Sequence, residues 1–571
     1  MQRHDPPALI ALSCAAFALA GCRFDPGPPA GAVTGSSLPP GARSGGAAGF
    51  NAGPNVFVDP TLPPGTPDTF GGGASSDARP QVVYPLAGSM HPINLGDITF
   101  QWSQGKPQNQ VFRVEFTAPP RTYDFYLPCT RSQCIYQMPS QAWLAMADAL
   151  HGQAVSFTVA GSDGKGGSVS LSDPMTINFS PEAVRGGLYY WSTKLRGVYR
   201  LTFGSAKALP FIQPSSATNP DACAGCHSVS RNGARIAFTA VPATEGAFGG
   251  LAVAPTDDPS QRSVNPRSGV VDSSVPALSP DGSQVVVVLD AGYTATGEKD
   301  FILRDAVTGA EIKRLSTGHP FLGANRFATF PEWSPDGQTI AITVGTTAGG
   351  RTNYGATSLL TSDIALLPVN GGQFGPATVL VPATGSEYSF YPSWSPDGKW
   401  LVFATATMGG PSADDKSPAN RTARLRLVEV ATGNVYELGA ATQGPNSTAT
   451  WPKFTPFAQD GGDLMFISYS TKIDYGYVLQ QQNLMDGQTP ASSPPGWKHP
   501  QIWMAAVSLA NLRAGQDPSY APIWLPYQET TQDNHIPYWT EVITCQGDVD
   551  TAPCGADEFC TPQGTCQPVV P

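Results

Sequence analysis

The chain has 571 residues and a formal charge of −11, and only 13% of its residues are charged, against about 25% in a typical soluble protein. A chain this long should form several domains, and its acidic balance excludes nucleic acid as a partner, because there is no basic surface to neutralise phosphates. With 61 Gly and 56 Pro, the composition favours short strands joined by tight turns, and hence an all-β fold.

Residues 1–21 are predicted to be an export signal. The run from Ala8 to Ala20 is almost wholly apolar, but it is too short to span a bilayer. Leu19-Ala20-Gly21-Cys22 resembles the bacterial lipobox, which implies cleavage before Cys22 and acylation of that cysteine as a stable membrane anchor. Arg23, rather than Asp, follows the cysteine, and by resemblance this points to a Gram-negative outer membrane, with a periplasmic or surface-facing body. The alternative is an ordinary signal peptide with a chance cysteine.

Residues 22–80 are predicted to be the lipid anchor followed by a disordered tether. Gly, Pro, Ala and Ser dominate this segment, and it has scarcely any hydrophobic periodicity. A flexible chain of this length has a root-mean-square span of roughly 40 Å.

Residues 81–180 are predicted to be a separate β-sandwich with its own core. The candidate strands alternate apolar and polar residues, and their number and spacing resemble a fibronectin type III or immunoglobulin-like domain. Cys129 and Cys134 lie close together between strands, which predicts a local disulfide in an oxidising compartment. His91 and His151 also fall in this segment, and we expect both at its surface.

An internal repeat occupies residues 187–543. Each clear copy holds a Ser-Pro-Asp-Gly turn, in which Pro fixes φ, Asp caps the turn and Gly takes the positive φ, followed directly by an apolar strand. The Ser or Thr of the turn recurs six times, which predicts six blades: Ser230, Ser279, Ser334, Ser395, Thr455 and Thr540. The repeat resembles the propeller of TolB and its relatives, which also has six blades. The last copy has no strand beyond it, so we expect residues 187–203 to pair beside Trp539 and close the ring.

One motif in the chain carries recognisable chemistry. Cys223-Ala224-Gly225-Cys226-His227 matches C-x-x-C-H, the haem attachment motif of cytochromes c. The resemblance implies one haem c, with thioether bonds from Cys223 and Cys226 to the porphyrin and His227 as the proximal iron ligand. Three alternatives remain open: a Cys223–Cys226 disulfide, half of a zinc site, or a thioredoxin-like redox pair.

The repeat also suggests a sixth ligand for the iron. His535 lies two residues before Pro537 in the closing blade, which neighbours the blade of His227, so we predict that His535 is the distal ligand. The alternative is that His535 caps a turn beside Asn534. Weaker candidates for the same role are His319, Met408, His499 and Met485.

Residues 545–571 form a Gly/Pro/Asp-rich tail with four cysteines, Cys545, Cys554, Cys560 and Cys566. In an exported chain, four cysteines so close together predict two disulfides. Zinc is less favoured, because the tail has no His and no C-x2-C pair.

The sequence therefore predicts a membrane-tethered lipoprotein with one haem c, which passes electrons or senses redox state or a ligand, with an envelope or redox protein as its partner. The second hypothesis is a TolB-type binding scaffold in which any haem is structural. We do not expect an enzyme: a haem peroxidase needs an open sixth position and a distal acid or base, and no G-x-S-x-G or H-E-x-x-H motif is present.

Overall fold

The computed structural model describes residues 33–34, 42–75, 78–193, 195–202, 207–214, 216, 218, 221–241, 249–265, 274–290, 299–346, 359, 361–407, 420–443, 448–478, 499–541, 558–560 and 566–568. The predicted signal peptide, Cys22, Met408, Met485, Cys545 and Cys554 lie outside the described residues. Within this part of the chain, no helix is long and apolar enough to cross a membrane.

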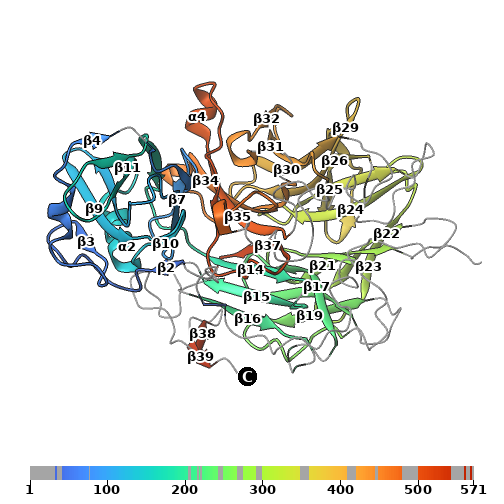
Figure 1. Cartoon of the computed structure of the whole chain (residues 1–571). Coiled ribbons are helices and arrows are strands. Elements are labelled where there is room, and N and C mark those ends of the chain that lie inside the picture. The colour runs from blue at the N-terminus through green and yellow to red at the C-terminus, as the bar shows by residue number, and fades with distance from the viewer. Residues whose placement is uncertain are drawn as a thin grey trace, which may run out of the picture.

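Within the described residues, six sheets form the blades of a propeller, so the predicted all-β, six-bladed fold is confirmed (Figure 1). Blade one consists of β17 (Cys223–Val229), β18 (Arg235–Val241) and β19 (Gly250–Pro255). Blade two consists of β20 (Ser274–Leu278), β21 (Gln284–Asp290), β22 (Lys299–Asp305) and β23 (Glu311–Ser316). Blade three consists of β24 (Arg326–Trp333), β25 (Thr339–Thr346), β26 (Ser362–Asn370), β27 (Gln373–Phe374) and β28 (Thr378–Val381). Blade four consists of β29 (Glu387–Trp394), β30 (Trp400–Thr407), β31 (Arg424–Glu429) and β32 (Val435–Glu437). Blade five consists of β33 (Thr450–Phe454), β34 (Leu464–Thr471), β35 (Gln501–Ser508) and β36 (Ile523–Trp524). Blade six consists of β37 (Asn534–Thr540), β14 (Gly187–Ser192), β15 (Gly197–Thr202), β16 (Lys207–Ile212) and β1 (Val33–Thr34).

The ring closes by pairing strands from both ends of the repeat region, as the sequence predicted. The last inner strand, β37, is antiparallel to β14, and Trp539 lies opposite Leu188 in the register. Strands β15 and β16 extend the same sheet outward. Closure gives β37 the neighbouring strand that the last repeat lacks, and a closed ring of blades leaves only short, protected sheet edges.

The turn after each inner strand shows why the Ser-Pro-Asp-Gly repeat recurs. In blade three the Ser334 hydroxyl donates to the Asp336 carboxylate at 2.5 Å, and the same carboxylate accepts the backbone N–H of Gln338 at 3.0 Å. Gly337 has a φ of +70°, a value that suits glycine. The turn therefore sets the direction of the next strand through bonds made within five residues.

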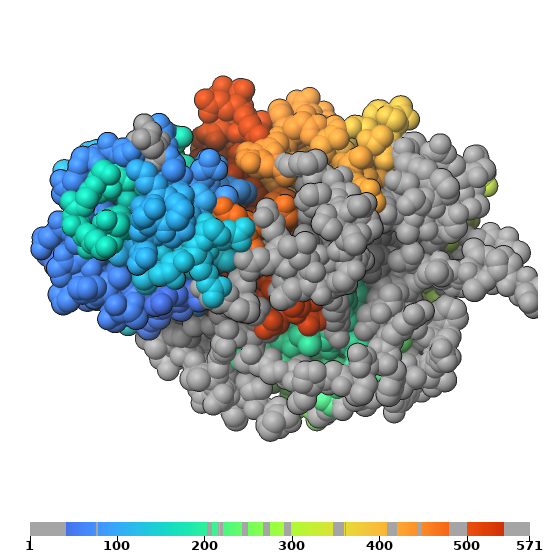
Figure 2. Space-filling view, viewed as in Figure 1, coloured from blue at the N-terminus to red at the C-terminus, as the bar shows by residue number. Residues whose placement is uncertain are grey.

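A second body, made of two sheets and one helix, packs beside the propeller (blue to cyan in Figures 1 and 2). One sheet holds β2 (Arg43–Ser44), β10 (Gln133–Gln137), β7 (Thr99–Ser103) and β5 (Val82–Tyr84). The other holds β3 (Val56–Val58), β9 (Arg121–Pro128), β8 (Val111–Ala118), β11 (Ala154–Ser162), β12 (Val169–Leu171), β4 (Ala74–Ser75), β13 (Met175–Phe179) and β6 (Met90–His91). The remaining elements are α2 (Ser140–Ala149), α4 (Leu509–Arg513), η1 (Thr66–Phe70), η4 (Ala440–Thr442), η5 (Asp460–Gly462), β38 (Glu558–Cys560) and β39 (Cys566–Pro568). The likeness of the two-sheet body to a fibronectin type III or immunoglobulin-like domain stays a prediction.

The prediction that residues 22–80 form a tether is wrong for residues 42–75. Strands β2, β3 and β4 each add a parallel strand to a sheet of the second body. Phe57 is completely buried and Phe70 is nearly so, and both pack into its core clusters. These few apolar residues supply enough burial to fold the segment, although the Gly and Pro between them hide any periodicity.

The expectation of a separate core for the second body is also wrong. Its buried residues form one hydrophobic cluster with those of blades five and six, including Leu188 and Trp539. Polar contacts join the two bodies as well: the backbone N–H of Trp524 donates to the Tyr84 hydroxyl at 3.0 Å, and the N–H of Tyr477 donates to the Gln101 side chain at 2.7 Å. The second body and the propeller therefore share one core.

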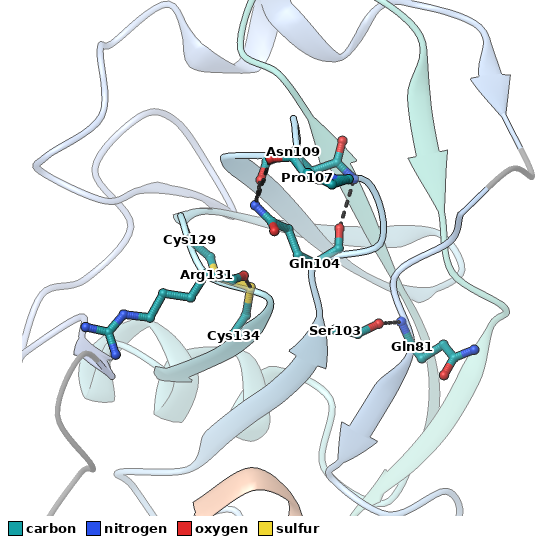
Figure 3. Close-up of a disulfide and its surroundings, with 8 residues drawn as sticks. All are labelled: Gln81, Ser103, Gln104, Pro107, Asn109, Cys129, Arg131 and Cys134. Carbon is teal, nitrogen blue, oxygen red and sulfur yellow. Dashed lines mark hydrogen bonds between the residues drawn. A yellow bond between two sulfur atoms is a disulfide. The ribbon is translucent and has the colours of Figure 1, made fainter.

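Cys129 and Cys134 are joined in the local disulfide that the sequence predicted (Figure 3). Their Cα atoms are 5.8 Å apart, and the bond closes the turn between β9 and β10. Beside it, the Gln104 and Asn109 side chains each donate to the other residue's carbonyl, at 2.6 and 3.0 Å. In the tail, Cys560 and Cys566 lie directly opposite each other in the register of β38 and β39.

The prediction that His91 lies at the surface is wrong. Its side chain is buried in the core against Trp143, with 5.7 Å between the two ring centroids. Burial lowers the pKa of His91 to about 3, whereas a histidine in the unfolded chain has a pKa of about 6.5. Between pH 6.5 and 4 the unfolded chain binds a proton at this residue and the folded chain does not. Acidification over this window should therefore lower the free energy of unfolding by about 1.4 kcal/mol per pH unit.

We predict that His91→Gln makes the urea midpoint fall less steeply from pH 6.5 to 4 than it falls in the wild-type protein. The matched control is His151→Gln, because His151 is exposed in the same body and its replacement should leave the slope unchanged. A wild-type slope in His91→Gln would contradict the prediction.

Candidate functional site

The inner strands surround a central channel, and one repeat position lines it at a bulge. Each inner strand departs from regular pairing at this point, and the bulged residue has a positive φ of 44–56° although none is glycine. We call this set the bulge ring: Cys226, Val275, Phe330, Tyr391, Trp451 and Ile536. Because a positive φ is strained for bulky residues, its recurrence in all six blades identifies the bulge as part of the repeat.

One side of the bulge ring consists of aromatic side chains, and the other consists of the smaller side chains of Cys226, Val275 and Ile536. Tyr391 and Trp451 stack at 3.8 Å between ring centroids, and Phe330 meets both edge-on at 4.3 and 5.4 Å. These rings line one cavity together with Cys226 and His227. A flat apolar wall thus faces the C-x-x-C-H motif.

The C-x-x-C-H motif lies on β17, the inner strand of blade one. Cys223 is opposite Val241 in the register and is completely buried, and the bulge then gives Cys226 a φ of +44°. His227 follows the bulge at the position where the other five blades have proline, and it is only 2% exposed. Both sulfur atoms are disulfide-bonded, which is the oxidised state that competes with haem attachment.

The imidazole of His227 is unusual for a buried polar group. Both ring nitrogens are buried, and neither has a hydrogen-bond partner of good geometry among the described residues. Burial lowers the pKa of His227 to about 3, an effect that the nearby backbone of Tyr189 offsets only weakly. A buried nitrogen without a partner costs about 1–3 kcal/mol, so the position calls for an explanation beyond packing.

The prediction that His535 faces His227 is wrong in the described residues. The His227 ring lies against Tyr538, with centroids 5.8 Å apart, whereas the His535 ring lies 6.4 Å from Trp191 and does not line the cavity. The repeat explains the difference, because His227 aligns with Pro537 and His535 aligns with a residue two positions earlier, on the far side of the bulge. The cavity is lined at this point by Ile536.

The other histidine candidates are also remote from the cavity. His319 lies in the turn between β23 and β24, where its ring packs on Phe321. His499 is held by Asp533, with 2.6 Å between Nδ1 and the carboxylate. Burial lowers the pKa of His535 to about 4. Among the described residues, therefore, His227 is alone among histidines in lining this cavity.

A second ring of residues lies two positions before the Ser or Thr of each turn. We call it the polar ring, and its members in blade order are Ser228, Ala277, Glu332, Ser393, Lys453 and Tyr538. The Tyr538 hydroxyl donates to Glu332 Oε2 at 2.9 Å, and the Lys453 ammonium donates to the same oxygen. Blades three and six are opposite each other in a six-bladed ring, so the bond between Glu332 and Tyr538 spans the channel.

The electrostatics of the polar ring reflect burial and close pairing. Burial lowers the pKa of Lys453, and the Glu332 carboxylate partly offsets this shift. Burial, together with Glu332, holds the pKa of the Tyr538 hydroxyl well above its usual value. Sequence reasoning missed these residues. The signal in the repeat alignment was that one fixed position holds four different polar side chains, Ser, Glu, Lys and Tyr.

Beyond the polar ring, the channel opens into a mouth cavity on the side of the Ser-Pro-Asp-Gly turns. Its walls include Trp333, Trp394 and Arg231. The two indole N–H groups donate to the preceding blades, Trp333 to the Ala277 carbonyl at 3.2 Å and Trp394 to that of Glu332 at 3.0 Å. These tryptophans thus join neighbouring blades, and their packing role agrees with their recurrence in the repeat.

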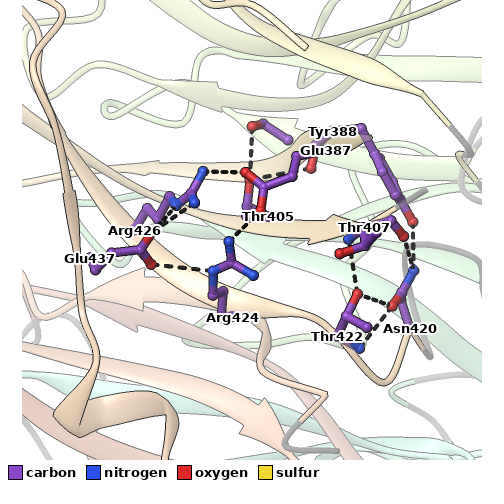
Figure 4. Close-up of polar contacts among 10 residues, drawn as sticks. Glu387, Tyr388, Thr405, Thr407, Asn420, Thr422, Arg424, Arg426 and Glu437 are labelled. Atoms are coloured by element: carbon purple, nitrogen blue, oxygen red, sulfur yellow. Dashed lines mark hydrogen bonds and ion pairs between the residues drawn. The ribbon is translucent and has the colours of Figure 1, made fainter. Parts of the chain in front are cut away.

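Other polar clusters in the described residues lie outside the channel. Arg424 and Arg426, on β31 of blade four, bind Glu387 at the start of β29 and Glu437 at the end of β32 (Figure 4). No group of three or more His, Cys, Asp or Glu side chains in the described part of the chain could hold a metal ion. The channel, with the C-x-x-C-H cavity and the mouth cavity, is therefore the candidate site.

Fold and site together define an all-β propeller protein with a candidate site in its central channel. No sequence model of a known family matches the chain, and no curated protein resembles it significantly in sequence. Similar solved structures include TolB from Acinetobacter baumannii, which is 11% identical, with coverage of 67% of this chain and 79% of that chain and a TM-score of 0.37. The putative TolB from Agrobacterium tumefaciens is 15% identical, with coverage of 62% and 99% and a TM-score of 0.33. Kuenenia stuttgartiensis hydrazine synthase is 14% identical, with coverage of 58% and 77% and a TM-score of 0.30.

Proposed function

We propose that the protein is an exported, membrane-anchored propeller that carries one covalent haem c in its channel and serves electron transfer or redox or ligand sensing. The observation that carries the proposal is the buried imidazole of His227, which directly follows two cysteines in C-x-x-C-H order and whose ring nitrogens have no hydrogen-bond partner of good geometry among the described residues. An iron ligand is a role that would account for such a nitrogen.

The residues present fit this group in their chemistry. Cys223 and Cys226 would hold the porphyrin by thioether bonds, and His227 would bind the iron, which supplies one-electron redox chemistry when the haem is bound. The aromatic wall of the bulge ring would exclude water from the site, and a less polar environment tunes the reduction potential. Attachment requires both cysteines as thiols, so their disulfides must first be reduced.

The test is to produce the full chain with haem-maturation machinery and run it on a denaturing gel stained for haem. The proposal expects a stained band at the mass of the mature chain, together with the absorbance spectrum of a c-type haem. A pure protein without haem, made under conditions that mature a control cytochrome, would overturn it in favour of the disulfide.

Membrane anchoring through Cys22 gives a separate prediction. We expect Cys22→Ser to move the protein from the membrane fraction to the soluble fraction almost completely, because the acyl chains are its anchor. The measurement is immunoblotting of fractionated cells, and Cys14→Ser is the matched control, since this residue lies inside the predicted signal peptide. Retention of Cys22→Ser in the membrane fraction would contradict the prediction.

The second candidate function is a binding scaffold in the cell envelope, in which any haem is structural. The mouth cavity favours it, because aromatic side chains such as Trp333 and Trp394 lie there beside convergent polar groups such as Lys453 and Tyr538. An intact protein that binds a partner equally well with and without haem would support this reading.

A further inference from the structure

The mouth cavity and the C-x-x-C-H cavity meet at the polar ring, because Lys453 and Tyr538 line both of them. Glu332 joins these two side chains and lines the mouth cavity. Three polar groups from blades three, five and six therefore form the floor of a solvent-connected cavity.

The fold does not require these side chains. The same repeat position holds Ser228, Ala277 and Ser393 in the other three blades, and both serines only accept backbone N–H groups of a neighbouring blade. Burying a lysine and a glutamate together costs desolvation energy that apolar residues of the same size would avoid. A requirement for stability therefore does not explain the charged pair, whereas a requirement for binding does.

The donors of the polar ring suit an anion. An ammonium group has three N–H donors, and among the described residues the hydrogen-bond acceptor of Lys453 is one oxygen of Glu332. Lys453 is only 8% exposed, and its ammonium lies 4.0 Å from the centroid of the Tyr538 ring. A ligand carboxylate could accept from the two remaining N–H donors of the Lys453 ammonium, and the Tyr538 hydroxyl could turn from Glu332 to donate to the same carboxylate.

The walls of the cavity suit an apolar body on the same ligand. Trp333, Trp394, Leu278 and two prolines, Pro280 and Pro335, stand around the polar floor. Aromatic and aliphatic side chains beside convergent polar groups are typical of sites for small organic molecules.

We infer that the mouth cavity binds a small organic carboxylate with a compact apolar body, held by Lys453 and Tyr538. The inference does not depend on the haem, because neither residue belongs to the C-x-x-C-H motif. Binding should be equal in protein made with and without haem, so the two proposals can fail separately.

Isothermal titration of the full chain with three probes of one shape tests the inference. Phenylacetate carries the carboxylate, phenylacetamide is its neutral analogue and phenethylamine is a cation. We expect phenylacetate to bind at least about tenfold more tightly than either of the others, as a charge-assisted hydrogen bond implies. Tighter binding of the amine, equal binding of all three, or no binding of any would each overturn the inference.

Two variants locate the site. Lys453→Met should weaken phenylacetate binding by at least about tenfold, and Lys399→Met, which replaces an exposed lysine in the blade-four turn, should leave it unchanged. Tyr538→Phe removes only a hydroxyl and should weaken binding several-fold, so it decides the question if Lys453→Met does not fold. If Lys453→Met folds, wild-type affinity in both variants would overturn the inference. If it does not fold, wild-type affinity in Tyr538→Phe alone would overturn it.

Discussion

Replacing both Cys223 and Cys226 with alanine should abolish covalent haem completely. After production with haem-maturation machinery and denaturing electrophoresis, the wild-type chain should stain for haem and the double variant should not. The physical reason is that the thioether bonds survive denaturation, whereas an iron–imidazole bond does not hold the porphyrin to an unfolded chain. Each single variant should keep a reduced amount of haem, held by the one remaining bond.

The matched control for this experiment is the double variant Cys129→Ala/Cys134→Ala. It removes two cysteines joined in a disulfide of the second body, away from the channel, and it should stain like the wild-type chain. Haem staining of the Cys223→Ala/Cys226→Ala variant equal to wild type would show that the haem is attached elsewhere. Loss of staining in both double variants would point to a general failure of folding or maturation.

Trp539→Ala should destabilise the protein by about 3–5 kcal/mol, the usual cost of removing a large aromatic side chain from a core. Trp539 lies on β37, the strand that closes the ring, and is 6% exposed. Its indole N–H donates to the Ser468 hydroxyl at 2.7 Å, and its ring belongs to the core cluster shared by the propeller and the second body. The measurement is the free energy of unfolding from urea titrations followed by circular dichroism.

Two controls separate packing from hydrogen bonding in this prediction. Trp539→Phe keeps an aromatic ring but loses the bond to Ser468, so it should cost clearly less than the alanine variant. Val435→Ala changes an exposed residue on the outer strand of blade four and should lie within about 0.5 kcal/mol of wild type. Because the core is shared, Trp539→Ala should shift the unfolding of both bodies together. Unchanged unfolding of the second body would contradict the shared core.

Much of the architecture could be predicted from the sequence, because it rests on local chemistry. The Ser-Pro-Asp-Gly turns make their bonds within a few residues, as Ser334 and Asp336 illustrate, so six recurrences of the repeat in the sequence become six blades. Closure beside Leu188 followed from counting strands, since the last repeat lacked a partner. The disulfide between Cys129 and Cys134 followed from a separation of only five residues.

Other features were decided only by the tertiary structure. Residues 42–75 fold because they pair with the edges of strands that lie much later in the chain and pack into the same core. The composition of the segment does not indicate either contact. Because His227 follows the bulge of its strand and His535 precedes the bulge of its own, the two rings contact different residues. The bulge is a one-residue irregularity that a linear alignment of repeats does not resolve.

The polar ring depends most on the closed ring. Glu332 is separated by 121 residues from Lys453 and by 206 residues from Tyr538, and none of the three has a local motif. The sequence by itself determined that a propeller forms and that a C-x-x-C-H motif lies on its first inner strand. Only closure of six blades around one axis brought three side chains from separate blades within bonding distance, because equivalent positions of a repeat meet at the axis whatever their separation along the chain.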